Sequence, residues 1–151
     1  MRGLSFLTNG ENFTVDVALV KKVVRNMVFT PIPAAPDAVA GIASLKGRIV
    51  TILSLTELLG RGRDAQAVNV VIFKPLTDGN DQMGLLIDKP GDLIDINDNE
   101  ILPLPRAAGE EEKLCISGMT EVEGILYRII NIGSIISRFE HNAENAADTI
   151  Y

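Results

Sequence analysis

A motif of twenty residues occurs twice in this chain, and it constrains the fold more than any other feature. Residues 41–60 read GIASLKGRIVTILSLTELLG, and residues 118–137 read GMTEVEGILYRIINIGSIIS. Both copies carry glycine at their first and seventh positions, namely Gly41 and Gly47 in one copy and Gly118 and Gly124 in the other. Glycine accepts a positive φ or a bulge without steric cost, so each copy predicts a strongly bent hairpin. Because a bent hairpin curls a short sheet into a barrel, two copies predict two small barrels.

The same order of elements surrounds each copy. A hairpin of alternating or β-branched residues comes first, as in NFTVDVAL (12–19) and in NVVIF followed by QMGLLID. A proline-rich crossing follows, TPIPAAP in one half and LPLPR in the other, since proline fits extended crossings and sheet edges. The glycine motif and a short helix come last. We expect the turn of the first hairpin at Gly10-Glu11-Asn12, and helices at TELL before Gly60 and at GSIISRF.

We therefore expect one all-β domain over residues 1–151, made of two small barrels packed together, with short helices after the paired hairpins. Its approximate subdomains are 1–66 and 67–140, and an exchange of strands between them is left open. Residues 141–151 are expected to form a tail. The acidic stretch RAAGEEEKLCIS (106–117) is expected to be an exposed loop.

Charge and cysteine content exclude several classes of partner. The formal net charge is −6, so general attraction to nucleic acid or anionic lipid is not expected. Cys115 is the only cysteine, so there is no disulfide framework and a reducing compartment is permitted. The sequence has neither the apolar run of a signal peptide nor a stretch long enough to span a membrane. These features predict a cytoplasmic protein without direct membrane insertion.

The sequence offers no convincing catalytic or metal-binding group, so no enzyme, metal or cofactor is expected. His141, the only histidine, has no triad partner near it and is expected at the surface. Cys115 lies between two apolar residues and is expected to be a buried apolar side chain. DINDNE (95–100) starts like a calcium loop but has Glu100 where that loop needs glycine, so an Asx turn is the better interpretation. Four other aspartates have no fixed separation, namely Asp78, Asp81, Asp88 and Asp92.

Surfaces remain, and they favour protein binding. Two barrels packed side by side leave a groove, and such grooves bind helices or sheet edges. Positive charge on this acidic chain gathers near the first motif, at Lys21, Lys22, Lys46 and Arg48. Two interpretations stay open: these side chains are ordinary solvated cations, or they form a patch that faces a partner.

Residues 41–55, GIASLKGRIVTILSL, resemble the signature G-V-x-N-L-R-G-x-I-V-P-V-x-D-L of the chemotaxis coupling protein (CheW) family. The resemblance extends over nearly the whole chain. FTVDVALVKKV is similar to the family's first return strand, and TPIPAAP to its T-x-I-P-x-x-P crossing. MGLLIDKPGDLIDINDNEILPLP is similar to the strands of its second half, and ISGMTEVEGILYRIINIGSII to its closing hairpin and helix. The order and spacing of these pieces together carry the resemblance.

The resemblance implies a non-enzymatic adaptor built from two five-stranded SH3-like barrels. Its partners would be the cytoplasmic tips of chemoreceptors and the regulatory domain of a CheA-type histidine kinase, in signalling arrays at the membrane. The receptor-binding groove would lie between the barrels, and one barrel end would contact the kinase. Carried over by position, the groove residues are Val20, Lys22, Val23, Gly41, Lys46, Gly47 and Leu93.

The chain also departs from the family signature. Lys46 replaces the signature arginine, and lysine cannot hold a carboxylate in arginine's bidentate fork. Lys22 replaces a glutamate that is common in the return strand, which reverses the charge. Ser44, Thr51 and Ser54 replace asparagine, proline and aspartate. We expect a divergent coupling protein with its own receptor or kinase. The alternatives are a self-associating or other protein-binding β-barrel scaffold, and a barrel protein with a ligand pocket between its halves.

Overall fold

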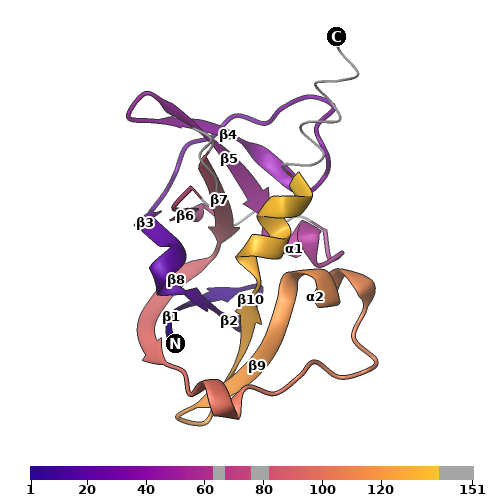
Figure 1. Ribbon diagram of the computed structural model, residues 1–151. Coiled ribbons are helices and arrows are strands. Elements are labelled where there is room, and N and C mark those ends of the chain that lie inside the picture. Colours follow the sequence, from indigo (N-terminus) through magenta and orange to yellow (C-terminus); the bar gives the residue numbers. More distant parts are fainter. Residues whose placement is uncertain (63–66, 76–81, 140–151) are drawn as a thin grey trace.

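The computed structural model describes residues 1–62, 67–75 and 82–139, in which strands predominate (Figure 1). The strands are β1 (Arg2–Thr8), β2 (Glu11–Asp16), β3 (Val20–Val24), β4 (Val39–Leu45), β5 (Arg48–Ser54), β6 (Asn69–Phe73), β7 (Gln82–Ile87), β8 (Lys89–Asp95), β9 (Ile116–Val122) and β10 (Ile125–Ile130). The short helices are α1 (Leu55–Leu58) and α2 (Glu110–Cys115), with 3-10 turns η1 (Val17–Leu19) and η2 (Asp98–Glu100). A further helix covers residues 132–139.

The strands of the described residues form two five-stranded sheets. The first has the order β8-β1-β2-β10-β9, and the second has the order β3-β6-β7-β5-β4. Each sheet closes on itself because the segment after its first edge strand pairs with its other edge strand, through the bridges Leu102–Met119 and Thr30–Ile42. The predicted all-β architecture of two small barrels is confirmed. We call these the first barrel (β1, β2, β8, β9 and β10) and the second barrel (β3 to β7).

The barrels exchange strands between the two halves of the chain. Hairpin β1–β2 belongs to the first barrel, whereas the strands that follow it, β3, β4 and β5, belong to the second. Hairpin β6–β7 then completes the second barrel, and β8, β9 and β10 complete the first. The barrels therefore do not follow the expected subdomains 1–66 and 67–140. The exchange that the sequence left open is present: each barrel takes one hairpin from the other half of the repeat. The second barrel is nevertheless continuous in sequence, from β3 to β7, whereas the first barrel is divided into β1–β2 and β8–β10.

The two barrels have the same register in their parallel strand pairs, which are β2 with β10 in the first barrel and β7 with β5 in the second. Strand β10 runs parallel to β2, and its Arg128 lies opposite Phe13. Thr51 and Arg128 each lie ten residues after the first glycine of their copy of the motif. Thr51 lies on β5, opposite Met83 of β7. The repeat in the sequence is therefore also a repeat in three dimensions, in which β10 corresponds to β5 and β2 to β7.

The edge strands β8 and β3 correspond in the same way. Leu93 of β8 pairs with β1 at the position where Val23 of β3 pairs with β6, and a bulge lies on the N-terminal side of both residues. The residues just before them are therefore counterparts too, and these are Asp92 in the first barrel and Lys22 in the second.

The second glycine of each motif closes a two-residue turn. Gly47 and Gly124 have φ angles of 78° and 81°. The residues before them, Lys46 and Glu123, have φ angles of 50° and 52°. Positive φ at both central residues gives the twist that joins two antiparallel strands. Lys46 and Glu123 are therefore counterparts at the tips of the β4–β5 and β9–β10 turns.

The first glycine of each motif allows a close approach of the crossing segment. A Cβ on Gly41 would lie 2.5 Å from the carbonyl oxygen of Thr30, and one on Gly118 would lie 2.9 Å from that of Leu102. The ladder also shifts register beside both glycines. The motif therefore has the bend and the positive φ predicted for it, together with a close backbone contact that the sequence did not predict.

The turn of the first hairpin lies earlier than expected. Asn9 and Gly10, with φ angles of 51° and 78°, form the turn, and Glu11 already pairs with Thr8. The expected turn at Gly10-Glu11-Asn12 was wrong because asparagine followed by glycine is the stronger turn signal.

The helices are confirmed in part. In α1, the hydroxyl oxygen of Ser54 accepts a hydrogen bond from the backbone N–H of Glu57 at 3.3 Å, and Gly60 follows with a positive φ. The helix at 132–139 agrees with the expectation for GSIISRF. The acidic stretch is not only a loop, because Glu110–Cys115 form α2. Three glutamates in its first turn are favourable there, since a helix N-terminus attracts negative charge.

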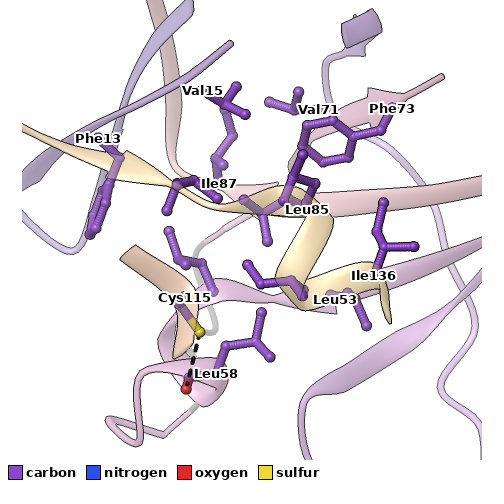
Figure 2. Close-up of a cluster of buried hydrophobic side chains, with 14 of the residues drawn as sticks. Phe13, Val15, Leu53, Leu58, Val71, Phe73, Leu85, Ile87, Cys115 and Ile136 are labelled. Carbon is purple, nitrogen blue, oxygen red and sulfur yellow. Dashed lines mark hydrogen bonds between the residues drawn. The ribbon is translucent and has the colours of Figure 1, made fainter. Parts of the chain in front are cut away.

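The main hydrophobic core lies between the two barrels (Figure 2). Phe13 and Val15 of the first barrel and Phe73 and Leu85 of the second belong to it, and Ile136 covers it from the 132–139 helix. Because both barrels bury apolar side chains in one core, the described residues form a single packed unit. A smaller cluster fills the second barrel itself, and its members are Met27, Ala40, Ala43, Val50, Ile52, Ala67, Val70, Ile72 and Leu86.

Candidate functional site

Residues 1–62, 67–75 and 82–139 contain no group of three or more His, Cys, Asp or Glu side chains that could hold a metal ion. In DINDNE, the side-chain oxygen of Asn97 accepts a hydrogen bond from the backbone N–H of Asn99 at 3.0 Å, which confirms the Asx turn. His141, Asp78 and Asp81 lie outside the described residues.

A helix long and apolar enough to cross a membrane is absent from the described part of the chain.

Cys115 is buried, as expected, with 1% of its surface exposed. Its thiol points at the carbonyl oxygen of Leu58, 3.8 Å away (Figure 2). Burial raises the pKa of the thiol from 9.0 to about 11, with smaller opposing effects of Arg138 and Glu111. The thiolate is the reactive form of cysteine, so Cys115 is unreactive at neutral pH.

Three of the expected groove residues lie in β3. Val20 and Val23 are half-buried and pack against the core between the barrels. Lys22 lines a hollow on the surface of the second barrel together with Lys46. The strand therefore offers apolar contacts to the core and a cation to solvent.

Three more lie in the β4–β5 hairpin. Lys46 and Gly47 are exposed at the turn tip, whereas Gly41 is buried beneath Thr30 near the other end of β4. Gly41 therefore shapes the hairpin from a position distant from the turn.

Leu93 lies on β8 of the first barrel, with 49% of its surface exposed. It is the counterpart of Val23, which is half-buried. The structure brings Lys22 and Lys46 together in one hollow, and Leu93 does not line it.

We call the hollow that contains Lys22 and Lys46 the basic pocket. Its volume is about 250 Å³, and its lining residues are Lys21, Lys22, Leu45, Lys46, Arg48 and Gln82. It lies at one end of the second barrel, where β3, the β4–β5 turn and the start of β7 meet. Every charged residue of its lining is positive, although the chain as a whole has a net charge of −6.

The sequence indicated the four cations of the basic pocket but not Gln82. Lys21, Lys22, Lys46 and Arg48 stood out as positive charge near the first motif. Gln82 begins β7 and pairs in parallel with Val50, a contact that depends on the exchange of hairpin β6–β7 into this barrel. A single glutamine before an apolar run carries no signal of that kind.

A larger hollow of about 390 Å³ lies beside α1 and the 132–139 helix. Its charged lining residues have mixed signs, and they are Asp37, Glu57, Glu111 and Arg138. Three acidic residues and one basic residue leave this lining with a net negative charge, so it does not favour an anion.

Comparisons with known proteins agree with this architecture. A family model described as CheW-like domain matches residues 2–140. The chemotaxis protein CheW of Rhizobium meliloti is 26% identical over 93% of this chain and 90% of its own length. The chemotaxis protein CheW of Thermotoga maritima is 27% identical over 88% of this chain and 85% of its own length. The crystal structure of the scaffolding protein TtCheW from Thermoanaerobacter tengcongensis has a TM-score of 0.74 at 24% identity, and the match covers 86% of this chain and 88% of that one.

Proposed function

The chain belongs to the CheW-like domain family, and we propose that it is a non-enzymatic adaptor that couples chemoreceptors to a CheA-type histidine kinase. The observation that carries this proposal is the match of one family over residues 2–140, which include both barrels and the core between them. Two relatives that match most of the chain are named as chemotaxis proteins, which supports the same role.

The mechanism that fits this fold is geometric. An adaptor has to hold two partners at a fixed separation, and it therefore needs two surfaces on one rigid body. The two barrels share a core and exchange strands, so a partner bound to one barrel is held in a defined orientation relative to the other. Individually weak contacts suffice in an array, because neighbouring contacts raise the effective concentration of each partner.

We propose that the receptor tip binds across the barrels, at Val20, Lys22, Val23, Gly41, Lys46, Gly47 and Leu93. Leu93 supports this because it exposes 49% of an apolar side chain on an edge strand. Lys22 and Lys46 support it because they offer positive charge at β3, the strand of the second barrel that corresponds to β8. The adaptor would act at the cytoplasmic face of the membrane, where receptor tips and the kinase's regulatory domain meet.

A calorimetric titration tests the proposal with two partners from the protein's own genome: the regulatory domain of the CheA-type kinase, and a receptor tip. We expect micromolar binding to both, or about −8 kcal/mol each. Leu93→Asp and Lys46→Glu should weaken receptor binding at least tenfold and leave kinase binding unchanged. Leu126→Asp is the matched control for Leu93→Asp, because Leu126 is 50% exposed on the first barrel.

Failure of the folded wild-type protein to bind either partner would reject the adaptor. Light scattering on the same samples tests the alternative of a self-associating scaffold, because the adaptor is expected to keep one mass over a hundredfold range of concentration. A mass that rises with concentration, together with no binding to the kinase, would favour self-association.

A further inference from the structure

Among the described residues, the cations of the basic pocket differ from the Arg61 and Arg128 cluster in having no acidic partner. Arg61 and Arg128 each pair with both Glu11 and Glu112, which closes that cluster. Within the part of the chain that the structure describes, Lys21, Lys22, Lys46 and Arg48 form no ion pair. Four positive charges therefore line one small hollow, and no described acidic side chain is paired with any of them.

Gln82 adds a hydrogen-bond donor that lacks an acceptor. Its side chain lines the pocket with only 2% of the residue exposed, and its Nε2 has no hydrogen-bond partner among the described residues. Buried polar groups in proteins are nearly always hydrogen-bonded, so an unpaired one needs an explanation. The lysine and arginine side chains around it carry only donors and cannot supply the missing acceptor.

An acceptor from outside the chain would satisfy both features. It has to carry oxygen atoms for the N–H groups and negative charge for the four cations. An oxyanion has both properties, and hydrogen bonds between ionised groups are stronger than those between neutral ones. A phosphate group fits better than a carboxylate, because it has three free oxygens and a charge near −2 at neutral pH.

The first barrel shows that the fold itself does not require this chemistry. The counterparts of Lys22 and Lys46 are Asp92 and Glu123, both exposed. The same backbone positions therefore carry negative charge in one barrel and positive charge in the other. The positive charge is a property of this pocket alone and cannot be attributed to a demand of the hairpin geometry.

We propose that the basic pocket is a binding site for a phosphate group, held by Lys21, Lys22, Lys46 and Arg48 and by the side-chain amide of Gln82. This goes beyond the adaptor function, since phosphate binding needs neither receptor nor kinase. Because Lys22 and Lys46 belong to both surfaces, a bound phosphate would compete with a receptor tip for them.

An NMR titration of the isotope-labelled full chain with inorganic phosphate, at constant ionic strength, tests the proposal. We expect saturable shifts of the Gly47 backbone amide and the Gln82 side-chain amide, with a dissociation constant on the order of 1 mM or below. Acetate serves as the carboxylate reference and chloride as the reference for an anion without oxygen atoms. Both should bind at least tenfold more weakly than phosphate. Glycerol phosphate, run in parallel, distinguishes a phosphate ester from free phosphate as the source of the group.

Matched variants assign the binding to the pocket. Lys46→Gln should lower the affinity for phosphate about tenfold, as expected for the loss of one charge-assisted contact. Glu123→Gln should not lower it, because this variant neutralises the counterpart turn at nearly the same φ. Gln82→Leu should lower phosphate affinity without lowering the thermal midpoint, since it removes a buried donor that has no partner in the free protein.

Three results would overturn the proposal. One is phosphate binding no stronger than chloride binding, and another is phosphate affinity unchanged in both Lys46→Gln and Gln82→Leu. The third is a glutamate-rich peptide that occupies the pocket and is not displaced by phosphate, which would assign the pocket to an acidic protein segment. None of these results depends on kinase binding, so this proposal and the adaptor function can fail separately.

Discussion

In the first barrel, Gly3 of β1 leaves room for a side chain of the neighbouring strand: a Cβ on Gly3 would lie 2.2 Å from the hydroxyl oxygen of Thr14. In the second barrel the counterpart of Gly3 is Val70 and that of Thr14 is Gly84, so the larger side chain lies on the other strand. A Cβ on Gly84 would lie 2.5 Å from Cγ1 of Val70. The shared register determines how much space lies between two strands, but either strand can fill it.

The two interiors also differ in polarity. Ser5 and Thr14 are buried in the first barrel, where the Ser5 hydroxyl donates to the carbonyl of Asp92 at 3.0 Å and that of Thr14 to Leu4 at 3.1 Å. The counterpart of Ser5 in the second barrel is Ile72, which is fully buried in an apolar cluster. We infer that the second barrel is held mainly by apolar packing, and the first partly by hydrogen bonds from side chains to its own backbone.

Truncating one isoleucine in each barrel should lower the free energy of unfolding by different amounts, because the two interiors differ in apolar packing. Ile52 and Ile129 occupy the same motif position and are both buried, but only Ile52 belongs to an apolar cluster of the described residues. Ile52→Ala should lower the free energy of unfolding by about 4 kcal/mol and Ile129→Ala by about 2 kcal/mol, because the site among apolar neighbours loses more contacts. Urea unfolding measures both, and equal losses would contradict the distinction.

Exchanging the large and small residues of the first barrel should test whether the strands share one space. Gly3→Val should lower the free energy of unfolding by about 3 kcal/mol, because its side chain would overlap Thr14 and Ile96. The double variant Gly3→Val with Thr14→Gly copies the second barrel and should recover more than half of that loss. A double variant as unstable as the sum of the two single ones would show that the space is not shared.

Cys115 offers the test with the smallest expected effect. It lies three residues before Gly118, and its counterpart, three residues before Gly41, is Ala38. Burial raises the pKa of the thiol from 9.0 to about 11, so the folded state disfavours the thiolate. The associated stability is present below pH 9 and is lost as the pH rises toward 11. Wild type should therefore lose stability relative to Cys115→Ala over this interval, measured by urea unfolding at a series of pH values. Parallel pH curves for the two proteins would contradict the assigned cause.

The sequence predicted the features that depend on neighbouring residues. Gly47 and Gly124 fall in turns, and the helix predicted at TELL before Gly60 is present, one residue earlier, at Leu55–Leu58. The exchange of hairpins could not be predicted, since the choice between two similar barrels depends on contacts across the whole chain. In the candidate site, Lys22 and Lys46 were indicated by resemblance to a family. Gln82 was missed because its role depends on strand pairing with Val50.

The exchange of strands also governs when the protein can fold during its own synthesis. Hairpin β1–β2 leaves the ribosome before the other strands of the first barrel, and its Thr14 pairs with Ile129 of β10. The second barrel has all its strands once β7 has been made, but the apolar hairpin β1–β2 stays without its partner strands until β8, β9 and β10 follow. Contacts so distant in sequence slow folding and expose unpaired edges to other chains. Newly made protein should therefore depend on chaperones until β10 has been made, and completion of the first barrel, not of the second, is the event that commits it to the native state.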